Sequence, residues 1–249
     1  MLTEPMMVHL QTLGLRGMVR ALERQHQSPD VMALSFEDRL TLLLQHELAE
    51  RQSYRLAQRL RWARLPQAAC VEDIDARTPR GLDRSRLAQL TDLGWIGQHL
   101  NVLLTGPTGV GKSYLACALA HQACRHDYSV RYFRVPRLTE ELLRAGAQQK
   151  KSAFFKLLAR ADLLILDDFG LTPLADTFKR DLLEIIDDRF DRKSTLITSQ
   201  MPLDAWHPYF DDPTLADAIL DRLVHNAYKI DLKGDSMRKR KTPERAPPA

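Results

Sequence analysis

The chain has 249 residues, and 44% hydrophobic and 27% charged residues give it the composition of a globular protein rather than of a disordered or a membrane protein. Its longest apolar run, Tyr114 to Ala120, is too short to cross a bilayer, and its N-terminus lacks the basic and apolar regions of a signal peptide. We therefore expect a cytoplasmic protein with no membrane partner. The three cysteines form no CxxC pair, so the sequence predicts neither a disulfide framework nor a zinc site.

The net charge of +4 is concentrated toward the two ends of the chain. Residues 101–232 carry 17 basic and 18 acidic side chains, whereas residues 233–249 carry 6 basic and 2 acidic ones. This basic C-terminal tail ends in a proline-containing stretch and is not expected to fold on its own. It is equally consistent with a nucleic-acid tether and with a solubilising end.

Residues 1–65 predict a small all-α domain that binds DNA or a partner protein. Apolar residues recur there at helical spacing, and the segment from Gln27 to Pro29 marks a turn. Ser35 is the expected N-cap of the helix that follows, with Asp38 in the capping-box position.

Basic residues crowd into the end of this segment, in the run RQSYRLAQRLRWAR. At 3.6 residues per turn, Arg51, Arg55 and Arg59 would line one helix face. Arg61 and Arg64 extend the cluster, and no acidic residue interrupts it. The cluster is interpreted as a phosphate-binding face for DNA, with a solvated helix face as the alternative.

Residues 66–99 predict a linker that leads to a short helix near Ser85 to Leu93. From residue 100 to residue 232, short apolar runs alternate with helical stretches. The runs are NVLLT, SVRYF, LLILDD, STLIT and YKIDL. This rhythm predicts an α/β domain around a five-stranded parallel sheet.

The first of these strands is followed by GPTGVGKS and then by an amphipathic helix, which is the context in which the GxxxxGK[ST] pattern binds phosphate. Glycine allows the loop N–H groups to turn toward a nucleotide, Lys112 would bridge the β- and γ-phosphates, and Ser113 would bind Mg²⁺. We expect ATP and Mg²⁺ as cofactors. The predicted nucleotide-binding residues are Gly106, Pro107, Thr108, Gly109, Val110, Gly111, Lys112, Ser113 and Tyr114.

Two consecutive acidic residues end the strand LLILDD. Asp167 would hold Mg²⁺ through water, and Asp168 would orient the attacking water. The strand SVRYF intervenes in the chain between this strand and the loop strand. That arrangement favours the ATPases that carry an acid after the Mg²⁺ aspartate over nucleotide kinases and GTPases.

Two more side chains are candidates for the reaction. Ser199 or Gln200, at the end of STLITSQ, would reach the γ-phosphate or its water, with ordinary strand-end polarity as the alternative. Arg222 lies on a predicted helix of otherwise apolar spacing. It is either a surface residue or an arginine finger that enters a neighbouring subunit's site.

The motifs GPTGVGKS, LLILDDFG, TLITSQ and DRLVHNAYKIDLKGDSMRK, after a helical segment that ends RLRWARLP, resemble the IstB-like helper ATPases of insertion-sequence transposons. The resemblance covers about residues 8 to 241. It places the chain in the initiator clade of AAA+ P-loop NTPases, close to the DnaC helicase loader. It implies an ATPase that oligomerises on double-stranded DNA, deforms it, and recruits or stimulates a partner transposase of the DDE integrase type.

The resemblance also assigns roles by position. Gly106 to Ser113 match Walker A, Asp167 and Asp168 match Walker B, Gln200 falls at the sensor position, and Arg222 matches the arginine finger. AAA+ proteins usually have Glu where Asp168 stands, so we expect slow hydrolysis stimulated by oligomerisation or DNA. The usual helical lid is expected to be reduced or absent, and Arg238 could partly replace its sensor-2 arginine.

In this clade a helical insertion after the second strand faces DNA. Here it would be roughly Pro136 to Arg160, which makes Lys150, Lys151 and Lys156 candidates for phosphate contacts, with a solvated charge run as the alternative. The alternative functions are a DnaC-like replicative helicase loader and a small-molecule phosphotransferase. The second would need a substrate lid and an acceptor pocket that the sequence does not reveal.

Overall fold

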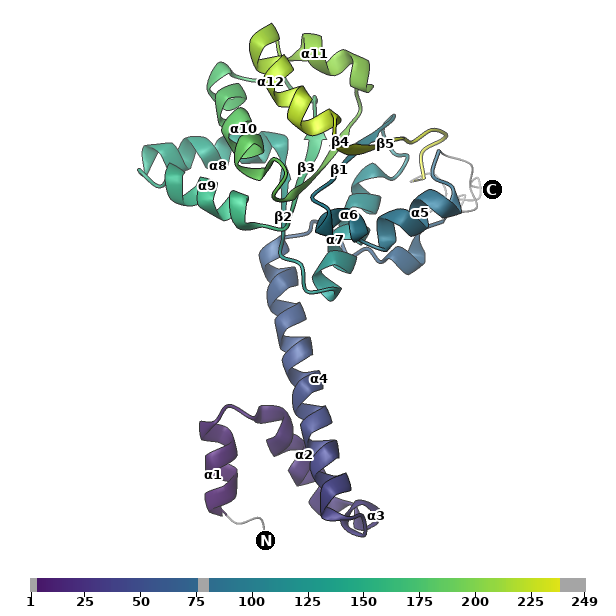
Figure 1. Ribbon diagram of the computed structural model, residues 1–249, viewed down its shortest axis with the longest axis vertical. Helices are drawn as coiled ribbons and strands as arrows, with labels where there is room; N and C mark the ends of the chain where they lie inside the picture. Colours follow the sequence, from purple (N-terminus) through teal and green to yellow (C-terminus); the bar gives the residue numbers. More distant parts are fainter. Residues whose placement is uncertain (1–3, 76–80, 238–249) are drawn as a thin grey trace, which may run out of the picture. The chain divides into compact units, whose positions relative to one another are not determined.

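The computed structural model describes residues 4–75 and 81–237 (Figure 1). Arg238 and the basic tail beyond it therefore lie outside the described residues. The chain divides into two compact units, residues 1–58 and residues 59–249. Within the described ranges, no helix has both the length and the apolar character needed to cross a membrane.

Over its described residues, 4–58, the first unit is built from helices alone, as predicted. They are α1 (Glu4–Thr12), α2 (Arg16–Gln27), α3 (Pro29–Met32) and α4 (Phe36–Ala63), of which the last turn belongs to the second unit. Ser35 caps α4 as expected, because its Oγ accepts a hydrogen bond from the Asp38 N–H at 3.1 Å and donates to the Asp38 carboxylate at 2.7 Å.

Within this unit, a carboxylate from α4 caps the N-terminus of α2. Glu47 Oε2 accepts hydrogen bonds from the N–H groups of Gly17 at 2.7 Å and Met18 at 3.2 Å, and Glu47 Oε1 accepts one from Arg51 at 2.6 Å. The two helices approach so closely that a Cβ at Gly17 would lie 2.6 Å from the Glu47 Cα. Glycine is therefore needed where α2 crosses α4.

The second unit contains the predicted five-stranded parallel sheet, and the predicted strands are confirmed. They are β1 (Asn101–Thr105), β2 (Val130–Arg134), β3 (Leu163–Phe169), β4 (Ser194–Ser199) and β5 (Ala227–Asp231). Their order across the sheet is β2-β3-β4-β1-β5. Although β2 separates β1 from β3 in the chain, β4 separates them in the sheet, and β2 lies at its edge.

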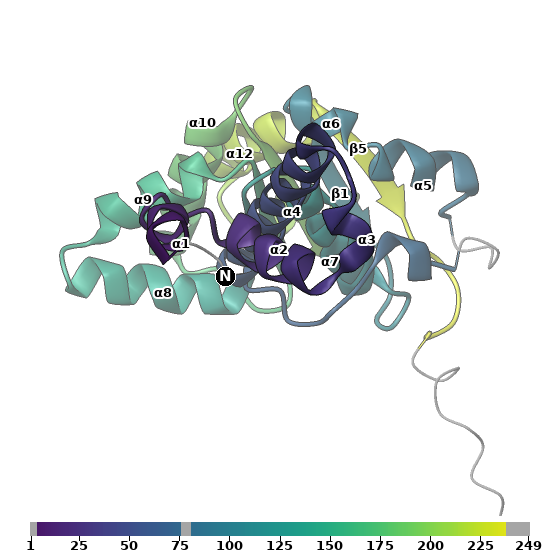
Figure 2. The same ribbon diagram turned by 90° about the horizontal axis from the view of Figure 1, so that it is seen from below.

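Helices cover both faces of the sheet (Figures 1 and 2). On one side, α8 and α9 lie side by side and continue into the layer formed by α10 and α12, while α7 packs on the other face against β3 and β4. The remaining elements are η1 (Val71–Asp73), α5 (Arg84–Thr91), α6 (Gly94–Gly97), α7 (Lys112–Arg125), α8 (Val135–Ala147), α9 (Lys151–Arg160), α10 (Asp176–Arg189), η2 (Leu203–Ala205), α11 (Trp206–Tyr209) and α12 (Pro213–Val224).

The main core lies between the sheet and the layer of α8 to α12. Leu103, Leu166 and Ile197 project into it from three neighbouring strands. Trp206 and Phe210 close it from the helical side and pack against the Phe169 ring. Because helices cover both faces, the three central strands β3, β4 and β1 are buried along nearly their whole length, whereas the edge strands β2 and β5 carry exposed positions.

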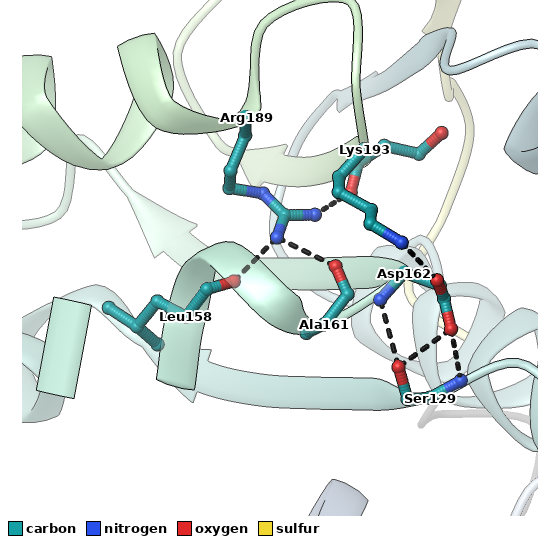
Figure 3. Close-up of polar contacts among 7 residues, drawn as sticks. Ser129, Leu158, Ala161, Asp162, Arg189 and Lys193 are labelled. Atoms are coloured by element: carbon teal, nitrogen blue, oxygen red, sulfur yellow. Dashed lines mark hydrogen bonds and ion pairs between the residues drawn. The ribbon is translucent and has the colours of Figure 1, made fainter. Parts of the chain in front are cut away.

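A buried arginine joins three elements at the amino ends of the strands (Figure 3). The Arg189 guanidinium donates to the carbonyls of Leu158 at 2.6 Å and Ala161 at 2.8 Å, and also to the carbonyl of Ser194. Its Nε donates to Thr195 Oγ1 at 3.1 Å. Burial lowers the pKa of Arg189 to about 9, and the guanidinium compensates for its lost hydration with these backbone acceptors.

Beside it, Asp162 ties the starts of β2, β3 and β4 together. Its carboxylate accepts hydrogen bonds from the Ser129 N–H at 2.8 Å and hydroxyl at 2.7 Å, and it pairs with Lys193 at 2.5 Å. Burial alone would raise the pKa of Asp162, but the hydrogen bonds from Lys193 and Ser129 outweigh it and lower the pKa. These hydrogen bonds and the ion pair thus hold the amino ends of β2, β3 and β4 together.

We predict that Arg189→Ala lowers the free energy of unfolding by about 3 kcal/mol or more, because it leaves three buried carbonyls without their donor. The exposed neighbour Arg192 provides the control, and Arg192→Ala should change stability by less than about 0.5 kcal/mol. Urea unfolding followed by tryptophan fluorescence measures the second unit, since all 3 tryptophans lie in it. Equal unfolding midpoints for the two variants would contradict the structural role of Arg189.

Candidate nucleotide-binding site

The carboxyl ends of β1, β3 and β4 meet at one edge of the parallel sheet. This edge receives the glycine-rich loop after β1, the two acidic residues at the end of β3, and the polar residues at the end of β4. Open α/β sheets bind their ligands at such an edge. The fold therefore gathers the residues that the sequence identified separately.

The loop between β1 and α7 depends on glycines with left-handed backbone angles. Gly106, Gly109 and Gly111 have φ angles of +135°, +89° and +99°. A Cβ on Gly106 would lie 2.0 Å from the Leu232 carbonyl oxygen, and one on Gly109 would lie 2.3 Å from Ser236 Oγ. The segment after β5 thus packs directly on the loop, and the Met237 N–H donates to the Gly109 carbonyl at 2.9 Å.

Lys112 begins α7, and its side chain turns back into the loop. The ammonium donates to the carbonyls of Gly106 at 2.6 Å and Pro107 at 2.8 Å. Burial lowers the pKa of Lys112, and the charges of Asp167 and Asp168 oppose that shift. A buried ammonium at a helix N-terminus, inside a glycine-rich loop, is a setting that binds phosphate.

The other residues of the predicted nucleotide-binding stretch differ in how far they are exposed. Pro107 and Thr108 are exposed on the loop, whereas Val110 is buried beneath it. Tyr114, in the first turn of α7, is half-buried, and burial raises its pKa.

Asp167 is almost fully buried and is brought together with Ser113. The Ser113 hydroxyl donates to Asp167 Oδ1 at 2.9 Å, and the hydroxyls of Tyr132 and Thr198 donate to the same carboxylate. A hydroxyl and a carboxylate oxygen are ligands that suit Mg²⁺, which takes few protein ligands when it is bound with a nucleotide. Over the described residues, no cluster of three or more His, Cys, Asp or Glu side chains forms an all-protein metal site.

Asp168 leaves the regular path of β3. Its φ of +61° coincides with a shift in the β3–β4 register between Leu166 and Phe169. The Asp168 N–H donates to Thr198 Oγ1 at 3.2 Å, and its carboxylate pairs with Arg134 Nε at 2.7 Å. This hydrogen bond raises the pKa of Arg134. Because of this strained backbone, the Asp168 carboxylate points in a different direction from the Asp167 carboxylate.

The structure brings Gln200 to the loop. Thr108 Oγ1 donates to Gln200 Oε1 at 2.7 Å, so the end of β4 touches the loop after β1. Ser199, the alternative considered above, instead donates to the Phe169 carbonyl at 2.8 Å and is fully buried.

Arg222 lies near the amino ends of the strands, at the opposite end of the sheet from the glycine-rich loop. Its backbone carbonyl accepts a hydrogen bond at 3.2 Å from the side chain of Asn101. Asn101 is the first residue of β1, whereas the glycine-rich loop follows the last residue of that strand. The guanidinium pairs with Asp187 on α10 at 2.5 Å and donates to the Ala218 carbonyl at 2.8 Å. The structure therefore does not bring Arg222 to Lys112 of the same chain.

The basic residues predicted to contact DNA differ in their partners. Arg51 pairs with Glu47 at 2.6 Å, Arg59 with Asp127 at 2.5 Å, and Arg64 lies 3.9 Å from Glu141. Lys151 pairs with Asp181 at 2.6 Å. Arg55, Arg61, Lys150 and Lys156 are exposed at the surface of their own units and form no ion pair with another described residue.

The sequence did not identify Tyr132, Arg134 or Thr198 as members of the site. All three contact Asp167 or Asp168. The available signal was their position near the ends of strands, but the order of strands in the sheet had to be known before that signal could be used. The stretch from Pro136 to Arg160 is helical, since α8 and α9 occupy it. That it is an insertion which faces DNA stays a prediction.

Comparison with known proteins gives a consistent result. The family model described as IstB-like ATP binding protein matches residues 8–245. The insertion sequence ATP-binding protein y4pL of Sinorhizobium fredii is 48% identical over 239 residues, covering 96% of this chain and 98% of that protein. The ATP-binding protein of insertion sequence IS1162 from Pseudomonas fluorescens is 49% identical over 203 residues, covering 81% and 88%.

Solved structures agree on the fold. The DnaC helicase loader has a TM-score of 0.56 at 20% identity and covers 66% of this chain and 97% of that one. AMPPCP-bound DnaA from Aquifex aeolicus has a TM-score of 0.55 at 18% identity, with 70% and 53% covered. At these identities the likeness concerns the fold alone, and it agrees with the predicted α/β architecture around a five-stranded parallel sheet.

We predict that Lys112→Ala weakens ATP binding at least about tenfold, because the variant loses the cation that the loop encloses. Lys229→Ala, which removes an exposed lysine on β5, should leave the dissociation constant unchanged. Titration calorimetry measures both. Equal affinity in the two variants would show that the loop is not the phosphate site.

Proposed function

The chain belongs to the family of IstB-like ATP binding proteins, and from this premise we propose that it is an ATPase that controls the insertion of a mobile DNA element. The observation that carries the proposal is the meeting of Lys112, the Ser113–Asp167 pair and Asp168 at one sheet edge. Bound Mg²⁺ would neutralise charge on the phosphates. The relatives named above are ATP-binding proteins of insertion sequences, which is why we assign the hydrolysis to transposition.

The residues of this chain divide the work of hydrolysis. Lys112 and the loop N–H groups hold the phosphates, Ser113 and Asp167 face the metal, and Asp168 orients the attacking water. Gln200, in contact with the loop, would touch the γ-phosphate side. The Asp168 side chain is one methylene shorter than the Glu usual in the class, and its carboxylate is paired with Arg134, so we expect slow turnover.

Each site would be completed by a neighbouring copy of the chain. Arg222 projects from the edge of the sheet opposite the glycine-rich loop, where it can reach another subunit's nucleotide but not its own. Over the described residues that follow β5, 232–237, no helix forms a lid. An ATP-dependent homo-oligomer would provide the missing cation in trans.

Double-stranded DNA would bind through phosphate contacts rather than through base recognition. Arg55 and Arg61 on α4, and Lys150 and Lys156 beside or on α9, are exposed and available for such contacts. Arg51, Arg59, Arg64 and Lys151 would first have to exchange the carboxylates that they contact. We therefore expect the four exposed residues to contribute most of the affinity.

The partner would be a transposase, because this chain offers an ATP site but no strand-transfer chemistry in its predicted motifs. A helicase-loader role is less well supported, since the likeness to DnaC is at 20% identity and concerns the fold alone. A pull-down with the full chain distinguishes the two roles: a transposase supports the proposal, and a replicative helicase contradicts it.

We predict that Asp168→Asn retains ATP binding but lowers turnover about 100-fold, because the amide cannot accept the proton of the attacking water. Arg222→Ala should lose turnover to a similar degree while its ATP affinity stays unchanged. Mixing the two inactive variants should restore part of the activity, since an Asp168 site on one subunit can meet Arg222 from another. Phosphate release measures this, and no recovery in any mixture would contradict completion of the site in trans.

We also predict a steep salt dependence of duplex binding in the presence of ATP. Replacing Arg55, Arg61, Lys150 and Lys156 with Ala should flatten the slope of log affinity against log salt by about 3 to 4. The control replaces the exposed residues Arg192 and Lys229 and should keep the original slope. Fluorescence anisotropy with unrelated duplexes measures it. An unchanged slope in the fourfold variant would place the DNA face elsewhere.

A further inference from the structure

The Asp167 carboxylate is held by three hydroxyl groups from three different elements. Ser113 on α7 and Thr198 on β4 donate to Oδ1, and Tyr132 on β2 donates to Oδ2. Both oxygens are therefore oriented, and the carboxylate is only 2% exposed. Each of these donors is neutral, so none of them cancels the negative charge.

This neutrality distinguishes Asp167 from its neighbour. Asp168 pairs with the Arg134 guanidinium at 2.7 Å, whereas the Asp167 carboxylate accepts hydrogen bonds from three hydroxyls. A carboxylate that must attract a divalent cation loses much of its attraction when a guanidinium already neutralises it. The hydroxyl donors fix the orientation of the Asp167 carboxylate without forming an ion pair with it.

Tyr132 reaches Asp167 across the outermost strand pair of the sheet. In the β2–β3 register, Tyr132 is opposite Ile165 and Arg134 is opposite Asp167, so the long phenol spans two residues toward the carboxyl end. The side chain is 7% exposed, and a buried phenol pays a desolvation cost unless its hydroxyl is hydrogen-bonded. Asp167 satisfies that hydroxyl.

Thr198 contacts both acids with one oxygen. Its Oγ1 donates to Asp167 Oδ1 and accepts the Asp168 N–H at 3.2 Å. The second bond lies where the register between β3 and β4 shifts, so the hydroxyl takes the place of a regular ladder contact. Thr198 therefore fixes the first acid through its carboxylate and the second through its backbone.

We propose that Tyr132 and Thr198 are positioning residues that hold the Asp167 carboxylate in the orientation needed to bind Mg²⁺. The inference rests on the proposed function, because it assumes that ATP binds here with the metal. Neither residue contacts the nucleotide in this scheme. They act through Asp167, as outer hydrogen-bond partners of metal ligands do in other proteins.

The test measures ATP binding, not turnover, as a function of Mg²⁺ concentration. Tyr132→Phe and Thr198→Val each remove one hydroxyl and retain the shape of the side chain. We expect the affinity for ATP in EDTA to stay unchanged and the Mg²⁺ concentration for half-maximal stimulation of binding to rise about 10-fold or more. Thr198→Ser, which restores the hydroxyl, should return to the wild-type value, and Tyr228→Phe on β5 is the matched control.

The outcomes separate the two levels of the proposal. Wild-type protein whose ATP affinity does not respond to Mg²⁺, or Lys112→Ala that binds ATP normally, would contradict the proposed function itself. A normal response in the wild type together with the same response in Tyr132→Phe and Thr198→Val would overturn only the positioning roles. If Thr198→Val fails to fold in a thermal unfolding control, Tyr132→Phe decides, since its phenyl ring keeps the buried packing.

Discussion

The position of β4 between β1 and β3 is the constraint on which the nucleotide site depends. Hydrogen bonds along both sides of β4 bring the loop strand and the acidic strand to its two flanks. From that place β4 presents Thr198 to the two acids on one side and Gln200 to Thr108 of the loop on the other. Without this central strand, the glycine-rich loop and the acids would have no common neighbour.

The two edges of the sheet are stabilised by different physical means. At the amino ends, Arg189 and Asp162 form hydrogen bonds with fixed partners of the same chain, which stabilises this end of the sheet. At the carboxyl ends, Lys112 donates to loop carbonyls that a phosphate could replace. The helix α10 connects the buried arginine to the proposed subunit contact, because it carries both Arg189 and the Asp187 that pairs with Arg222.

The features that were predicted correctly depend on residues that are close together in the sequence. Strands, helices and the Ser35 cap follow from periodicity and short-range hydrogen bonding, and the glycine-rich loop is recognised from consecutive residues alone. Contacts that depend on the strand order were not predictable. Tyr132, for example, reaches Asp167 only because β2 lies beside β3, and the partner of Arg59 is Asp127, far along the chain. The arginine-rich run contains no acidic residue of its own, but in the structure an acidic side chain from a distant part of the chain pairs with Arg59.

The pairing of β1 has a consequence for the order in which the protein can be made. β1 ends at Thr105, but its neighbours β4 and β5 begin at Ser194 and Ala227, and the backbone that packs on Gly106 belongs to Leu232. Ribosomes add about 5 to 20 residues per second, so the apolar strand NVLLT waits roughly 4 to 18 s for its first sheet partner. During that interval nucleotide has no finished loop to stabilise. ATP can therefore act only on a chain in which the segment through Leu232 has been made and has packed on the loop.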